Sequence, residues 1–85
     1  MEKRWSEDAW NEYLYWQLVD KDMLKKINEL IKSIDREGPM KGIGKPEPLK
    51  KRKGYSRRIT KEHRLVYDVE DGVLYLYSCK GHYEE

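Results

Sequence analysis

Three side chains of this sequence, Glu47, Arg64 and His82, could together cleave a phosphodiester bond without a metal ion. A carboxylate can take the proton from an attacking hydroxyl, and an imidazole can protonate the departing oxygen. A guanidinium can bridge two phosphoryl oxygens and stays charged while it does so. Because RNA carries its own nucleophile, the 2′-hydroxyl, we assign Glu47 as candidate base, His82 as candidate acid and Arg64 as candidate phosphate clamp.

Basic residues around these three form a second group of candidates. Residues 41–64 contain ten Lys and Arg against two acids, whereas residues 1–37 contain seven bases and nine acids, although the net charge of the chain is only +2. A local excess of positive charge attracts phosphate groups, and a solvated basic loop is the equally weighted alternative. The candidates for binding substrate phosphate are Lys45, Lys50, Arg57 and Arg58.

Each of the three central residues also has a structural explanation. Glu47 could be a solvated acid in a lysine-rich loop, and His82 lies near the chain end, where most residues are simply exposed. Arg64 shares one face of its expected strand with Asp68 and could pair with it. Taken singly, none of these residues makes a site.

Metal and thiol chemistry are not expected from this sequence. The two histidines, His63 and His82, are far apart, and neither an HExxH nor a CxxC motif occurs, so we expect no metal and no cofactor. Cys79 is the single cysteine and cannot form an internal disulfide. We expect it to be a buried structural thiol of a protein in a reducing compartment.

The length of 85 residues predicts one domain over residues 1–85. No apolar run approaches the roughly 18 to 20 residues that span a membrane, and residues 1–5 lack the apolar stretch of a secretion signal. We therefore expect a cytoplasmic protein that does not enter the membrane.

Two helices are expected in the first half of the chain. Ser6 is a good N-cap for a helix over residues 7–18, and Asp20 for a second helix that Gly38-Pro39 ends. Apolar residues at helical spacing should form the buried side of each helix. For the first helix they are Trp10, Tyr13, Leu14 and Gln17, widened by Ala9 and Trp16; for the second they are Met23, Leu24, Ile27, Leu30, Ile31 and Ile34.

The second half of the chain predicts strands. Residues 55–60, 63–69 and 73–79 have strand composition, and an Asp-Gly hairpin turn separates the last two. Lys3 to Trp5 is consistent with a further short strand, whereas the glycines and prolines of residues 40–54 predict an ordered loop without regular structure. The expected fold is therefore α+β, with an N-terminal helix hairpin packed on an antiparallel sheet of about four to five strands.

Several blocks of the sequence resemble the YoeB branch of the RelE toxin superfamily. The most specific are residues 44–50 (GKPEPLK), 56–60 (SRRIT) and 62–67 (EHRLVY), and further matches at residues 5–7, 13–17, 25–32 and 82–83 extend the resemblance over almost the whole chain. The resemblance implies a microbial-ribonuclease-like fold and a toxin that cleaves messenger RNA in the ribosomal A site, by metal-free acid-base catalysis.

The resemblance also implies roles for single residues. Glu47 falls where the family has its general base, Arg64 where it has the transition-state arginine and His82 where it has the general acid. Tyr83 matches a C-terminal tyrosine that helps to hold the substrate. Lys50 and Arg58 match supporting basic positions near the phosphate.

Partners follow from the family as well. They are messenger RNA on the 70S ribosome, ribosomal RNA, an antitoxin of the YefM type whose disordered acidic segment folds onto the toxin, and a second copy of the chain. The chain departs from the family pattern at Glu84 and Glu85, which follow the usual terminal tyrosine, and in a short basic loop at residues 51–55.

Two other functions remain open at this point. A toxin homologue that binds the ribosome, RNA or antitoxin without cleavage would keep the basic surface, and the acidic tail leaves this alternative in place. A gyrase poison of the ParE type would have the fold without the acid-base set, which the presence of Glu47, Arg64 and His82 disfavours.

Overall fold

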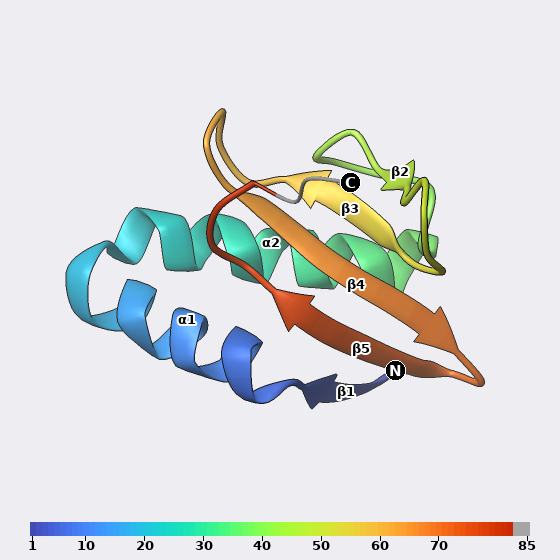
Figure 1. The fold of residues 1–85 in the computed structure, drawn as a ribbon, viewed down its shortest axis with the longest axis horizontal. Helices are drawn as coiled ribbons and strands as arrows, with labels where there is room; N and C mark the ends of the chain where they lie inside the picture. The colour runs from blue at the N-terminus through green and yellow to red at the C-terminus, as the bar shows by residue number, and fades with distance from the viewer. Residues whose placement is uncertain (83–85) are drawn as a thin grey trace.

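Two helices and a five-stranded sheet make up the fold (Figure 1). The computed structural model describes residues 1–82 of the chain. Along the described sequence the elements are β1 (Glu2–Trp5), α1 (Glu7–Val19), α2 (Lys21–Glu37), β2 (Glu47–Pro48), β3 (Tyr55–Arg58), β4 (Arg64–Glu70) and β5 (Val73–Ser78). This arrangement confirms the expected α+β fold with its N-terminal helix hairpin.

The sheet has the strand order β1-β5-β4-β3-β2. Neighbouring strands from β5 to β2 are antiparallel, as expected, but β1 runs parallel to β5 and makes the sheet a mixed one. Parallel neighbours need a crossover connection. Here the helix hairpin follows β1 along the chain and precedes all the other strands. The first strand therefore ties the start of the chain to its last strand.

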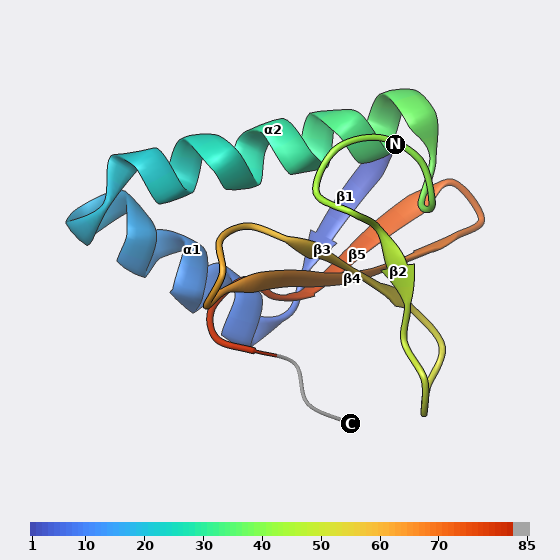
Figure 2. The ribbon, with the colours of Figure 1, turned by 90° about the horizontal axis from the view of Figure 1, so that it is seen from above.

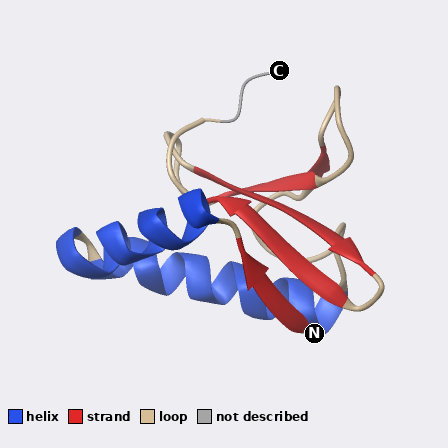
Figure 3. Cartoon of the chain, turned by 60° about the horizontal axis from the view of Figure 1, so that its bottom comes forward, coloured by secondary structure: helices blue, strands red, loops and turns tan. Residues whose placement is uncertain are grey.

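Helix α2 buries the apolar stripe that its sequence predicts. The Asp20 carboxylate accepts hydrogen bonds from the backbone N–H groups of Asp22 and Met23 and caps the helix. Its buried side consists of Met23, Ile27, Leu30, Ile31, Ser33 and Ile34, with Leu24 partly buried. Figures 2 and 3 show α2 along one face of the sheet, with α1 beside it.

Helix α1 begins as expected but buries only part of the expected stripe, with Tyr13 partly buried against the core. The Ser6 hydroxyl accepts from the N–H of Ala9 at 3.0 Å and caps it. Its buried residues are Ala9 and Trp16, whereas Trp10 and Leu14 remain 44% and 41% exposed. The expected burial of Trp10, Leu14 and Gln17 was therefore wrong. Helix α1 carries apolar and aromatic residues on more than one of its sides, and only its packing against α2 and β5 selects the side that is buried.

The turn and loop regions show one confirmation and one correction. Asp71 and Gly72 both have positive φ, 51° and 76°, as the expected two-residue hairpin turn requires. Glu47–Pro48, placed in an irregular loop by sequence, instead forms the edge strand β2, with Glu47 opposite Ser56. Proline lacks a backbone donor but is tolerated at a sheet edge, where one side needs no partner.

The core lies between the helices and one face of the sheet. Strand alternation directs Leu65 and Tyr67 of β4 and Leu74 and Leu76 of β5 toward the helices, where all four are fully buried. The opposite sheet face is thereby left to polar residues of β3 and β4. The loop that follows β2 projects on that opposite side, away from α2 (Figure 2).

Candidate active site

A cleft of about 460 Å³ opens beside β2, between the loop that follows it and the C-terminal segment. Its lining residues are Glu47, Pro48, Leu49, Lys50, Lys51, Ser56, Arg64 and His82. Four of the residues singled out by sequence, Glu47, Lys50, Arg64 and His82, are thus brought to one space from three segments of the chain. A carboxylate, an imidazole and two kinds of cation in one cleft can carry out proton transfer beside a bound phosphate.

Arg64 is the least exposed charged residue among those that line this cleft. Its Nη2 lies 3.6 Å from a carboxylate oxygen of Glu47, and its Nε donates to the Ser56 hydroxyl at 3.2 Å. The Arg64 side chain is 16% exposed and that of Glu47 is 64% exposed, so the guanidinium is held by its surroundings while the carboxylate reaches toward solvent. Glu47 is therefore solvated, yet it also faces the candidate phosphate clamp.

The alternative pairing of Arg64 with Asp68 does not occur. Asp68 is buried, its carboxylate accepts from the N–H of Val69 at 2.8 Å, and it lies 3.8 Å from the ammonium of Lys53. The short loop between β2 and β3 brings Lys53 over this acid. Arg64 is left to face the cleft.

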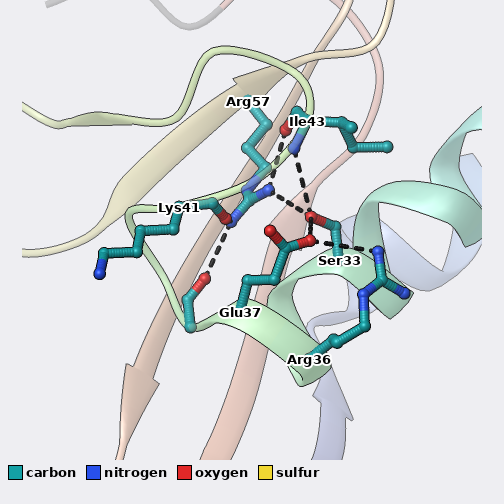
Figure 4. A network of polar contacts seen from close by, with 7 residues as sticks. Ser33, Arg36, Glu37, Lys41, Ile43 and Arg57 are labelled. Carbon is teal, nitrogen blue, oxygen red and sulfur yellow. Dashed lines mark hydrogen bonds and ion pairs between the residues drawn. The ribbon is translucent and has the colours of Figure 1, made fainter.

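The segment that leads to Glu47 is held from inside by Arg57 (Figure 4). The Arg57 guanidinium is fully buried, and Figure 4 shows it pointing into the turn of loop after α2. Its hydrogen bonds, 2.6 to 3.0 Å long, go to the backbone carbonyls of Gly38, Lys41 and Ile43 and to the hydroxyls of Ser33 and Tyr67. One side chain thus fixes the path of residues 38–43, just before the edge strand that carries Glu47.

This geometry corrects the assignment of Arg57 to phosphate binding. Arg57 pairs in register with Leu65 and faces the helices, whereas Ser56 and Arg58 face the other way. Burial raises the pKa of Tyr67, and the hydrogen bond from Arg57 counteracts part of that rise. Adjacent arginines in the SRRIT block look equivalent in sequence, but strand alternation makes one structural and leaves the other exposed.

Arg58 and Lys45 are exposed but do not line the cleft. Arg58 lies opposite Arg64 in the β3–β4 register and lines a second, smaller groove of about 190 Å³ with Ile43, Gly44 and other residues. Lys45 has a left-handed backbone, with φ of 52°, just before Pro46. Neither of these two predicted phosphate-binding residues is therefore part of the cleft lining.

The segment that carries His82 leaves the end of β5 and is anchored on α1. The N–H of Cys79 donates to the Glu12 carboxylate at 2.7 Å, and the indole N–H of Trp16 donates to the Cys79 carbonyl at 2.9 Å. The thiol is fully buried, and burial, followed by the negative charge of Glu12, raises the pKa of Cys79 to about 12. The expected role of Cys79 as a buried structural thiol is confirmed.

His63 makes a second anchor that the sequence did not reveal. Its Nδ1 accepts from the N–H of Gly81 at 2.8 Å, and the N–H of Arg64 donates to the Gly81 carbonyl at 3.1 Å. The His63 ring packs edge-on against Trp16, with centroids 4.9 Å apart. From sequence His63 was considered only as a metal ligand; its position next to Arg64 was the one available signal.

Two further observations concern only the described residues. Within residues 1–82, no three His, Cys, Asp or Glu side chains lie close enough together to hold a metal ion, and neither helix is long and apolar enough to cross a bilayer. Tyr83, the remaining predicted site residue, lies outside the described part of the chain.

Comparison with known proteins identifies close relatives. Residues 5–83 match the family described as YoeB-like toxin of bacterial type II toxin-antitoxin system. Toxin YoeB of Escherichia coli strain K12 is 57% identical over 81 residues, covering 93% of this chain and 95% of the relative. A YoeB dimer from Staphylococcus aureus superposes with a TM-score of 0.93 at 54% identity, and a YoeB-YefM complex from the same organism with 0.92 at 53%; each covers 98% of both chains.

Proposed function

Since the chain belongs to the YoeB-like toxins of bacterial type II toxin-antitoxin systems, we propose that it is an endoribonuclease that cleaves messenger RNA in the ribosomal A site. The observation that carries this proposal is the convergence of Glu47, Arg64 and His82 on one cleft. The sequence similarity covers nearly the full length of the YoeB relative, which supports the same class of activity.

In the proposed reaction the RNA supplies the nucleophile. Glu47 accepts the proton of the 2′-hydroxyl, and the 2′-oxygen attacks the adjacent phosphorus. As the bond between phosphorus and the 5′-oxygen breaks, His82 gives its proton to that oxygen. The products are a 2′,3′-cyclic phosphate and a free 5′-hydroxyl, and the reaction needs no metal ion.

Positive charge stabilises the negatively charged, five-coordinate phosphorus species that forms when the 2′-oxygen attacks. The Arg64 guanidinium exchanges its contact with Glu47 for the phosphoryl oxygens, and Lys50 assists from the cleft wall. Lys45 and Arg58, which are exposed outside the cleft, draw in the RNA strand and the ribosomal RNA. Tyr83 is proposed to hold the substrate.

We further propose two protein partners and a place for them. The solved structures of Staphylococcus aureus YoeB, a dimer and a complex with YefM, support a second copy of the chain and an antitoxin of the YefM type as partners. Exposed apolar residues on α1, among them Trp10, Leu14 and Leu18, offer surface for such contacts. The cytoplasm, where ribosomes are found, is the compartment in which this function operates.

The test is primer extension on a defined messenger loaded on purified ribosomes. Wild type should produce a cut in the A-site codon, and Glu47→Gln and His82→Ala should each reduce the rate about 100-fold, the usual loss for a proton-transfer group. Glu62→Gln is the matched control, an exposed acid of the same basic region that does not line the cleft. Both mutated side chains are exposed, so the fold should persist.

The outcomes separate the proposed enzyme from the binding protein. Full activity in either variant would remove that residue from the mechanism. No cut by the wild-type chain, together with retained ribosome or antitoxin binding, would favour a toxin homologue that binds without cleavage.

A further inference from the structure

The last described residues of the chain are held by contacts that converge on Gly81 and Cys79. Helix α1 contributes the contacts of Glu12 and Trp16. The other contacts come from His63, just before β4, and from the backbone of Arg64, the first residue of β4. Gly81 has a φ of +83°, so the chain turns sharply immediately before His82. Because a single peptide unit separates Gly81 from His82, whatever fixes Gly81 also limits where the imidazole of His82 can lie.

The contact of His63 with Gly81 is specific about chemistry as well as position. A backbone N–H can only donate, so Nδ1 of His63 must offer its lone pair, which places the ring proton on Nε2. The edge-on contact with Trp16 sets the tilt of the ring, and Trp16 also holds the Cys79 carbonyl. His63 and Trp16 therefore bind the same short segment, His63 at Gly81 and Trp16 at Cys79.

We propose that His63 is a positioning residue for the acid His82, and that it acts through the N–H of Gly81. The inference rests on the proposed function, because it assigns a role to the segment that carries the acid. The carboxylate side of the cleft needs no such help from His63, since Glu47 is carried by β2 and the loop that Arg57 holds. Loss of the His63 contact should thus weaken protonation of the departing oxygen and leave proton abstraction intact.

Two substitutions separate the hydrogen bond from the packing. His63→Phe keeps an aromatic ring against Trp16 but removes the acceptor at the Nδ1 position, so the Gly81 N–H is left without its partner. His63→Asn loses the ring but can place an amide oxygen close to where Nδ1 lies. Acid positioning predicts that the Asn variant works better than the Phe variant, whereas a purely packing role predicts the reverse.

The decisive measurement uses two messengers on purified ribosomes, one natural and one with sulfur in place of the scissile 5′-oxygen. A thiolate leaves without being protonated, so cleavage of the P–S bond no longer needs the acid. On the natural messenger, His63→Phe should lower kcat about tenfold, less than the full effect of removing an acid, with KM for the programmed ribosome unchanged. On the sulfur messenger, His63→Phe and His82→Ala should both approach wild type, whereas Glu47→Gln should stay impaired.

Amide exchange of the free protein provides a readout independent of cleavage. The Gly81 N–H should exchange faster in His63→Phe, stay protected in His63→Asn, and the amides of α2 should be unchanged in both. Protection of Gly81 that survives His63→Phe would overturn the inference.

The cleavage outcomes are equally clear. Wild-type activity of His63→Phe on the natural messenger, or an equal defect on both messengers, would show that His63 does not act through the acid. If the wild-type chain cuts neither messenger, the proposed function itself fails, which is distinguishable because failure of the inference alone leaves wild type active.

Discussion

The two segments that bring the candidate base and acid to the cleft are held in different ways. Residues 38–44, which lead to Glu47, surround a fully buried guanidinium that bonds to three of their carbonyls. Residues 79–81, which lead to His82, are attached by single hydrogen bonds with Glu12, Trp16 and His63 and with the backbone of Arg64. The segment before Glu47 therefore depends on one central group, whereas the segment before His82 depends on several separate ones.

This difference has consequences for stability and for motion. Removing the central group should release the whole loop at once, because its carbonyls lose their donors together. Removing one contact of the acid segment should loosen that segment locally and leave the rest of the fold intact. Moving the segment that carries the candidate acid should therefore require less free energy than moving the loop that leads to the candidate base.

The largest expected effect comes from Arg57→Met, which removes the donors but keeps a long apolar side chain. Several buried acceptors would be left unpaired, and the free energy of unfolding should fall by about 3 to 4 kcal/mol. Urea unfolding monitored by tryptophan fluorescence measures this. Arg58→Met, the exposed neighbour on the opposite face of β3, should stay within about 0.5 kcal/mol of wild type; equal losses in the two variants would contradict the central role of Arg57.

A glycine in each segment allows a matched comparison. Gly44 and Gly81 have similar φ, +86° and +83°, but a methyl group on Gly44 would lie 2.6 Å from Cδ2 of Leu30, whereas one on Gly81 would meet nothing within 4 Å. Gly44→Ala should cost about 2 to 3 kcal/mol, from backbone strain and crowding together, and Gly81→Ala about 1 kcal/mol from strain alone. The two thermal unfolding curves compare them directly, and a larger loss at Gly81 would reverse the comparison.

Trp16→Phe tests whether the segment before His82 is held independently of the loop around Arg57. The ring remains, but the donor to the Cys79 carbonyl is lost, and we expect a cost of about 1 to 2 kcal/mol. Hydrogen exchange should accelerate at Cys79 and Gly81 and not in the loop around Arg57. Trp10→Phe is the control on the exposed side of the same helix; faster exchange throughout the protein after Trp16→Phe would mean that the segments are coupled.

The smallest effect is a pH dependence. The Cys79 pKa is raised from 9.0 to about 12, so between these values the unfolded chain has lost the thiol proton that the folded chain keeps. The folded state then binds more protons, and stability falls as pH rises above 9. Between pH 8 and pH 10 the loss should be on the order of 1 kcal/mol, and Cys79→Ala should remove it.

The difference in the pH dependence of stability between wild type and Cys79→Ala measures the contribution of the thiol. Tyr67, whose pKa burial also raises, gives a slope of the same sign, but it is present in wild type and Cys79→Ala alike. Chemical unfolding of both proteins at the two pH values provides the measurement. Parallel stability curves above pH 9 would show that the thiol does not contribute.

Local chemistry explains why so much of the fold could be predicted. The Ser6 and Asp20 caps, the apolar stripe of α2 and the Asp-Gly turn depend on neighbours within a few residues, and all are found in the structure. The face of α1 could not be predicted, because its aromatic residues offer more than one apolar side and the packing of distant elements selects between them. The β2 strand was missed for a similar reason, since an edge pairing depends on β3.

For the site, residue types made Glu47, Arg64 and His82 candidates for phosphodiester cleavage, but none of them indicated a site when taken singly. Family resemblance to the YoeB toxins led to the same residues. Local sequence could not show that Arg57 is buried while Arg58 is exposed, or that His63 and Trp16 hold the chain before His82. These roles arise from contacts between residues up to 63 positions apart, and such contacts exist only once the sheet and the helix hairpin have packed together.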